Sequence, residues 1–117
     1  MKGFIIESPY KNFPSLSKSI MGWGNGYVAV PPTHVLWGKD YEEVNKHIVI
    51  HYGLTFSDII DNGSTIFLQY APEGWWVFGF DTGHFGDGLD RWPKEAVAAE
   101  TKKLLAQIFE LEMGELF

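Results

Sequence analysis

The segment from Pro93 to Met113 has the pattern of a long amphipathic helix, and this pattern constrains the rest of the chain more than any other feature. Proline suits the first turn of a helix, Glu95 lies where the helix dipole favours a negative charge, and Gly114 is a suitable end. Core-facing residues recur at helical spacing: Val97, Thr101, Leu104, Leu105, Ile108 and Leu111. Such a helix is about 30 Å long, so its apolar stripe needs the face of a sheet to cover.

Short segments rich in β-branched and aromatic residues precede this helix and predict the strands of such a sheet. Asp40 can cap a short helix over residues 41–46, with Glu43 at the capping-box position. The predicted strands cover residues 3–7, 27–30, 47–51, 54–57, 65–70 and 75–80, and residues 71–74 are a hairpin-type link that pairs the last two. This order predicts one α+β domain over residues 1–117, with a mainly antiparallel sheet covered on one face by the long C-terminal helix.

Three segments between these elements are predicted to be loops or turns. Residues 8–19 contain two prolines and four serines. Residues 22–26 alternate glycine with other residues but lack the Gly-Lys-Ser/Thr ending of a P-loop, so they predict a turn or bulge that enters the next strand. Residues 33–39 carry apolar side chains and are expected to pack down on the core.

The composition narrows the classes of partner. The formal net charge is −6 and no Lys/Arg cluster offsets it, so we expect no long nucleic acid as a main partner. No segment approaches the apolar length of a membrane span, and the first apolar run is too short for a signal peptide. The absence of cysteine removes disulfides, thiolate metal sites and cysteine nucleophiles, and it suits a cytoplasmic protein.

Residues 75–90 combine an aromatic strand with a glycine-rich loop that carries several titratable side chains. Loops fixed to a rigid strand are where binding residues tend to lie. With one histidine from elsewhere, this loop offers two imidazoles and two carboxylates: His51, Asp81, His84 and Asp87. Such a set suits zinc, manganese or iron, and equally suits acid–base chemistry or ligand contact. The alternative is structural, with Asp81 capping the turn and His84 merely pairing with it.

A second histidine pair is less informative than its spacing suggests. His47 lies four residues before His51, a spacing that binds zinc on a helix. The intervening Ile-Val-Ile predicts a strand, on which the two side chains would lie about 13 Å apart and could not share an ion. Together with the absence of cysteine, this separation predicts no tightly bound zinc and no cofactor. The metal alternative is the set His51, Asp81, His84 and Asp87.

Aromatic side chains are the other candidates for ligand contact, since the chain has nine Phe, five Trp and five Tyr. A strand over residues 75–80 would separate them onto two faces, with Trp76, Phe78 and Phe80 on one and Trp75, Val77 and Gly79 on the other. One face would meet the long helix, and the other would offer an aromatic wall with space for close approach at Gly79. Tyr27, Trp37 and Trp76 are the aromatic members of the predicted ligand site. The alternative is a second small core under residues 31–39.

Four blocks of the sequence occur in a distinctive order: residues 26–31 (GYVAVP), His34 with residues 37–41 (WGKDY), residues 50–56 (IHYGLTF) and residues 76–87 (WVFGFDTGHFGD). Together they resemble a family of small uncharacterised proteins found in bacteria, phages and prophages, over roughly residues 26–108. The chain departs from the family pattern where Val35 replaces Pro, Trp37 replaces Tyr and Tyr52 replaces Gly. The last change places a bulky ring beside His51, where it would narrow any cleft. The resemblance implies a genomic setting, and host cytoplasm for a phage-encoded protein, more than a mechanism.

These observations predict a small cytoplasmic binding protein and not an enzyme. A small polar ligand, such as a nucleotide signal, would lie between the Trp/Tyr surface and residues 81–87. The phage-type resemblance implies inhibition of host defence, by sequestering a nucleotide or masking a host factor. The alternatives are a metal-dependent hydrolase that uses the His/Asp set and a protein–protein inhibitor whose acidic surface binds a basic host protein. Exposed aromatic residues could close a symmetric dimer, and we expect a homodimer.

Overall fold

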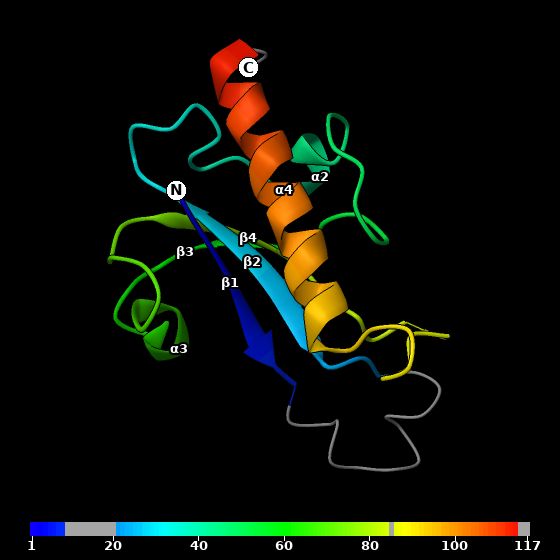
Figure 1. Ribbon diagram of the computed structural model, residues 1–117. Helices are drawn as coiled ribbons and strands as arrows, with labels where there is room; N and C mark the ends of the chain where they lie inside the picture. Colours follow the sequence, from blue (N-terminus) through cyan, green and yellow to red (C-terminus); the bar gives the residue numbers. More distant parts are fainter. Residues whose placement is uncertain (9–20, 85, 115–117) are drawn as a thin grey trace.

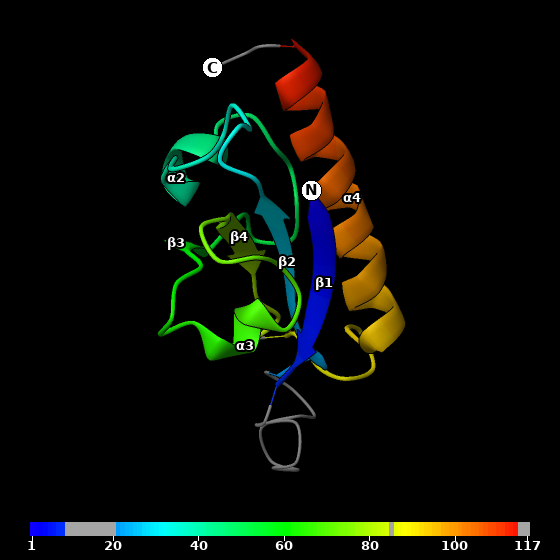
Figure 2. The same cartoon turned by 90° about the vertical axis from the view of Figure 1, so that its left-hand side faces the viewer.

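The described residues form a four-stranded antiparallel sheet with a long helix on one face (Figure 1, Figure 2). The structure is a computed structural model that describes residues 1–8, 21–84 and 86–114. The strands are β1 (Lys2–Glu7), β2 (Gly24–Val30), β3 (Phe56–Ile59) and β4 (Trp76–Phe80), in the order β1-β2-β4-β3. The helices are α2 (Tyr41–Val44), α3 (Thr65–Leu68) and α4 (Lys94–Gly114). This architecture confirms the predicted α+β fold.

Helix α4 crosses one face of the sheet and buries the stripe that its sequence predicts (Figure 1). The stripe joins side chains of β2, of β4 and of the segment between β2 and β3 in one core. Its buried members are Val97, Thr101, Leu104, Ile108 and Leu111, while Leu105 is partly buried. Within the described part of the chain, no helix is long and apolar enough to cross a membrane.

A glycine lets α4 approach β2 closely. Gly26 faces the helix, and a Cβ at this position would collide with the Thr101 hydroxyl and with the ring of Phe80. Thr101 can be buried here because its hydroxyl donates to the carbonyl oxygen of Val97 at 2.8 Å within the helix. Gly24 and Gly26 both belong to β2, which starts earlier than predicted. They lie in a strand and not in a phosphate-binding loop.

Alternation along β4 gives the sheet two different faces, as predicted. Phe78 and Phe80 lie in the core beneath α4, and Trp76 packs against that core. Val77 belongs to a smaller core on the opposite face. Aromatic side chains from β1, β2, β3 and α3 cover this smaller core: Phe4, Tyr27, Phe56 and Phe67. The second face is therefore an aromatic surface in contact with α3.

The strand and hairpin predicted over residues 65–74 are wrong. Residues 65–68 form helix α3, whose backbone N–H groups at Phe67 and Leu68 donate to the carbonyl oxygen of Ser64 at 3.0 and 3.1 Å. β4 does not pair with this segment, because both of its edges are already hydrogen-bonded, one to β2 and the other to β3. Residues 65–70 have β-like composition but no free edge of β4 to join, and tertiary context overrides such propensities.

The strand predicted over residues 47–51 is also wrong, because this segment lies alongside α4 instead of joining the sheet. Ile48 and Ile50 are buried in the main core. The N–H of Val49 donates to the side-chain oxygen of Gln107 at 2.7 Å, and the Gln107 amide donates to the carbonyl of Val49 at 3.0 Å. A helix side chain thus supplies the backbone partners that a neighbouring strand would have supplied. The strand predicted over 54–57 begins later and forms β3.

Two further predicted features are found in the structure, the Asp40 cap and the packed loop over residues 33–39. Asp40 caps α2 by accepting a hydrogen bond from the N–H of Glu42 at 2.8 Å, although the helix ends at Val44 and not at residue 46. Leu36, in the loop over residues 33–39, is fully buried, so this loop packs down as expected. The loop predicted over residues 8–19 lies outside the described residues except for Ser8.

Candidate functional site

The loop that follows β4 is anchored to the start of β2. Thr82 is buried, and its hydroxyl donates to the carbonyl oxygen of Gly24 at 2.7 Å. The Thr82 carbonyl accepts from the backbone N–H of Gly22 at 2.8 Å, and the Trp92 carbonyl accepts from the backbone N–H of Trp23 at the same distance. These bonds hold both ends of the loop, so that His84 and Asp87 lie between two fixed points of the backbone, with Asp81 beside the first.

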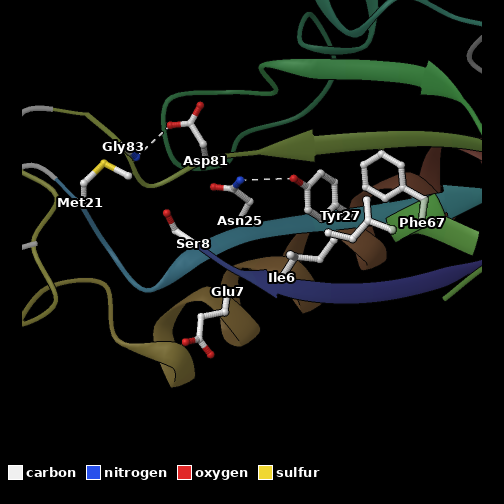
Figure 3. Close-up of a pocket in the computed structure, with 10 residues that line it drawn as sticks. Ile6, Glu7, Ser8, Met21, Asn25, Tyr27, Phe67, Asp81 and Gly83 are labelled. Atoms are coloured by element: carbon white, nitrogen blue, oxygen red, sulfur yellow. Dashed lines mark hydrogen bonds between the residues drawn. The ribbon is translucent and has the colours of Figure 1, made fainter. Parts of the chain in front are cut away.

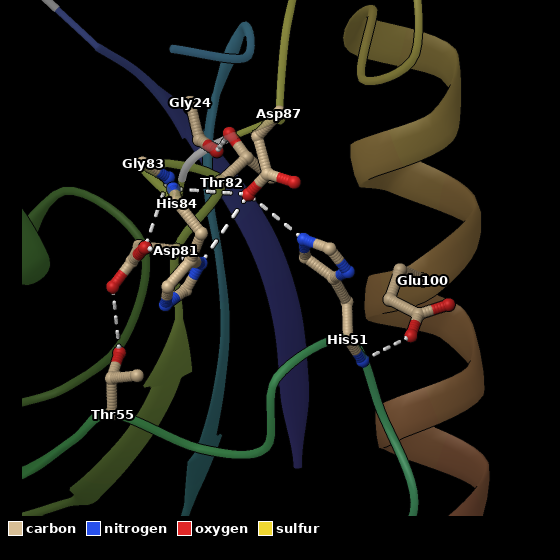
Figure 4. A network of polar contacts seen from close by, with 9 residues as sticks. All are labelled: Gly24, His51, Thr55, Asp81, Thr82, Gly83, His84, Asp87 and Glu100. Carbon is tan, nitrogen blue, oxygen red and sulfur yellow. Dashed lines mark hydrogen bonds and ion pairs between the residues drawn. The ribbon is translucent and has the colours of Figure 1, made fainter. Parts of the chain in front are cut away.

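Within this frame, two histidines converge on one aspartate (Figure 4). One oxygen of Asp87, Oδ2, lies 2.9 Å from His51 Nε2 and 3.3 Å from His84 Nδ1. The same oxygen accepts from the backbone N–H of His84 at 3.1 Å. The three side chains come from the loop after β4 and from the turn at residue 51. The structure therefore brings together the His51, His84 and Asp87 side chains that the sequence predicts as a set.

Asp87 is a buried carboxylate that depends on imidazole partners. Its side chain is 5% exposed, against 16% for His51 and 27% for His84. Among the described residues, its ion-pair partners are these two histidines and include no Lys or Arg. Burial of a carboxylate costs free energy unless positive charge or hydrogen bonds compensate it. The position of this carboxylate therefore depends on its contacts with the two imidazoles and with the backbone N–H of His84.

Packing fixes the orientation of both imidazoles. The backbone N–H of His51 donates to Glu100 Oε2 on α4 at 2.7 Å, and the His51 ring lies 4.1 Å from the Trp92 ring between centroids. Tyr52 stacks on His84 with 3.9 Å between centroids and 8° between planes. The bulky ring that the sequence places beside His51 therefore covers His84. Tyr52 is also the one non-glycine residue with positive φ among those described, at 55°, a conformation that costs free energy.

Asp81 connects this cluster to a neighbouring cavity. Its Oδ1 accepts from the N–H of Gly83 at 2.9 Å and lies 3.3 Å from His84 Nδ1, and its Oδ2 accepts from the Thr55 hydroxyl at 3.1 Å. Asp81 does cap the turn, as the structural alternative predicts, because it binds the Gly83 backbone. It also lines a cavity on its other side, so that the capping role and a binding role are compatible.

This cavity has a volume of about 630 Å³ and lies between the end of β1, β2 and α3 (Figure 3). Apolar and aromatic side chains form most of its wall, including Ile6, Met21, Tyr27 and Phe67. Its polar end carries Asn25 and Asp81. The Asn25 amide donates to the Tyr27 hydroxyl at 3.3 Å. Three polar groups from β2 and from the residue after β4 thus meet at one end of an aromatic cavity.

The Tyr27 hydroxyl stays protonated at neutral pH. Burial raises the pKa of Tyr27 above its ordinary value of 10.0, and the nearby Asp81 carboxylate raises it further, while the Asn25 hydrogen bond opposes both. A neutral phenol can donate one hydrogen bond and accept others. Tyr27 also fills the space that the sequence predicts at Gly79, since its ring lies where a Cβ of Gly79 would stand.

Trp37 and Trp76, the other predicted aromatic members of the site, lie apart from it. Trp76 is the first residue of β4, whereas Asp81 follows the last. The indole N–H of Trp76 donates to the Lys39 carbonyl and that of Trp37 donates to the Gly74 carbonyl, each at 2.9 Å. Their rings lie 5.9 Å apart between centroids. The two tryptophans hold the loop over residues 31–39 against the sheet, which fits the alternative of a packed core.

The sequence did not predict Asn25, Thr55 or Phe67 as neighbours of the site. Asn25 carried a usable signal, because it lies two residues before Tyr27 on a strand and such residues share a face. Phe67 was predicted to lie in a strand over residues 65–70, whereas it lies in α3. Thr55 reaches Asp81 only through the pairing of β3 with β4. Comparisons of the chain with protein-family models, with curated proteins and with solved structures found no match.

Proposed function

We propose that this protein binds a small polar ligand in the cavity between β1, β2, α3 and Asp81. One observation carries the proposal: the Tyr27 hydroxyl, the Asn25 amide and the Asp81 carboxylate meet at one end of an aromatic cavity of about 630 Å³. Ligand sites are typically concave and mostly apolar, with a few convergent polar groups that set orientation.

The chemistry of the lining narrows the ligand class. A carboxylate accepts hydrogen bonds and a neutral phenol does both, so the ligand should present N–H or O–H donors at this end. Phe67 and Ile6 offer apolar contact for a flat or apolar body. The described lining residues include Glu7 and Asp81 but no Lys or Arg, so they favour a nucleobase or an amine over a phosphate group. A nucleotide signal would then bind through its base.

Ligand binding can be tested with nucleobases, nucleosides and small aromatic amines, using thermal shift and NMR chemical-shift perturbation. Tyr27→Phe removes only the hydroxyl and should weaken binding about tenfold, the effect of one well-placed hydrogen bond. Asp81→Asn should weaken it by at least as much. Tyr70→Phe is the matched control, because Tyr70 stacks on Phe4 beside the cavity but does not line it. Equal affinities for Tyr27→Phe and Tyr70→Phe, or no binding by any compound of the panel, would refute the proposal.

A further inference from the structure

Three atoms of the types that bind transition metals lie close together next to this cavity. His51, His84 and Asp87 each offer one ligand atom, a ring nitrogen or a carboxylate oxygen, and these three atoms all lie within 4.8 Å of one another. We propose that these three residues form a binding site for a divalent transition-metal cation, such as Zn²⁺. The site is separate from the ligand cavity and does not depend on the function proposed above.

Two of the three distances between ligand atoms are close to those around a shared ion. Metal–ligand bonds of about 2.0–2.1 Å place neighbouring ligand atoms about 3.0–3.4 Å apart. Asp87 Oδ2 lies 2.9 Å from His51 Nε2 and 3.3 Å from His84 Nδ1. The remaining pair, the two histidine nitrogens, would have to close by up to about 1.4–1.8 Å from its upper limit of 4.8 Å. We assign this movement to the His84 side chain, which is the more exposed of the two imidazoles.

The chemistry of the set selects the class of cation. Two imidazole nitrogens and one carboxylate oxygen suit zinc, manganese or iron, whereas magnesium and calcium prefer oxygen ligands alone. A dication would also compensate the buried Asp87 carboxylate, whose ion-pair partners among the described residues are the two histidines. Three protein ligands leave at least one coordination position for water or for another group.

The surroundings hold the ligands in place, as outer-shell contacts do in metal sites. Tyr52 stacks on the His84 ring, Trp92 packs against the His51 ring, and Glu100 holds the His51 backbone. Asp81 adds a second carboxylate, 3.3 Å from His84 Nδ1. The sequence predicts no tight zinc because His47 and His51 are far apart on a strand. In the folded chain His51 meets His84 and Asp87, three members of the set that the sequence analysis gives as the metal alternative.

The test is a metal titration of the full chain, freed of any affinity tag and stripped with a chelator. Zn²⁺ is added in competition with a chromophoric chelator, and Co²⁺ is added to follow its visible absorption. We expect one ion per chain with micromolar affinity or tighter, and a Zn²⁺-dependent rise in melting temperature. His84→Ala and Asp87→Asn should each weaken binding at least tenfold, the lower limit typical even for outer-shell changes. His47→Ala, an exposed histidine outside the cluster, is the matched control and should bind as the wild type does.

Failure of this proposal is distinguishable from failure of the ligand proposal. Tyr27→Phe should leave metal affinity unchanged, because Tyr27 is not among the three ligands. Asp87 is buried, so circular dichroism is used to check that the Asp87→Asn variant is folded. If it is not, metal affinity is compared between His84→Ala, His51→Gln and the wild type. The proposal is overturned if the wild type shows neither 1:1 binding nor a Zn²⁺-dependent melting shift. It is equally overturned if His84→Ala binds as tightly as His47→Ala.

Discussion

Replacing Leu104 with alanine tests whether α4 is held by the stripe that faces the sheet. Leu104 is fully buried in the middle of α4, within the core that includes Val28 and Phe78. Truncating a fully buried leucine removes transfer free energy and leaves a cavity, at a cost of about 2–5 kcal/mol. The rigid aromatic and β-branched neighbours limit collapse, so we expect the middle or upper part of that range. A loss of this size is a large share of the total stability of about 5–15 kcal/mol for a domain.

Leu105→Ala is a matched control because it makes the same change one residue further along the same helix. Leu105 is only partly buried, and alanine and leucine have similar helix propensity. Its loss should stay below about 1–2 kcal/mol, since part of its side chain is already in water. Denaturant unfolding of both variants measures the difference, provided that the m-value is unchanged. Equal losses for the two variants, or a loss well under 1 kcal/mol for Leu104→Ala, would refute the packing of α4 described here.

Three further predictions concern single residues elsewhere. His34 is buried, its Nδ1 accepts from the N–H of Leu36 at 3.0 Å, and burial lowers its pKa below the ordinary 6.5 despite the opposing effect of Glu112. The unfolded chain therefore takes up the proton first as pH falls, so the stability of the wild type should decrease below about pH 6.5 more steeply than that of His34→Gln. Denaturant titrations measure both profiles, and parallel profiles would contradict this role of His34. Gly26→Ala should cost about 1–3 kcal/mol by forcing α4 and the Phe80 ring away from β2, whereas Gly3→Ala, whose Cβ would make ordinary contacts, should be neutral or slightly stabilising in the same unfolding assay. His84→Ala should lower stability by no more than about 1 kcal/mol in thermal denaturation, because its ring is partly exposed, while it weakens metal binding at least tenfold; a loss of several kcal/mol would show that the fold depends on His84.

The sequence by itself determined the elements whose signals are local. The stripe of α4 and the two-residue alternation of β4 depend only on the geometry of a helix and of a strand. Both were correctly predicted, as were the Asp40 cap and the α+β class that follows from the order of elements. The closeness of Asp81, His84 and Asp87 is local in the same sense, because three residues within one short loop can reach one another.

Only the tertiary structure decided how the β-like segments are used. Residues 47–51 and 65–70 have strand composition, yet the former is paired by the Gln107 side chain on α4 and the latter coils into α3. Because β2 and β3 occupy both sides of β4, residues 65–70 cannot form the predicted hairpin with that strand. No property of either segment alone reports which edges are taken.

The same distinction applies to the candidate site. His51 meets Asp87, 36 residues further along the chain, because the turn at residue 51 is held by Glu100 on α4. Tyr27 approaches Asp81 because its partner in the β2–β4 register is Gly79, two residues before that carboxylate. Trp37 and Trp76 are of a residue type that suits ligand contact, yet they lie near the start of β4, and the length of this strand separates them from the loop that carries Asp81. Residue type and spacing name the candidates, whereas strand register and helix packing decide which of them share a site.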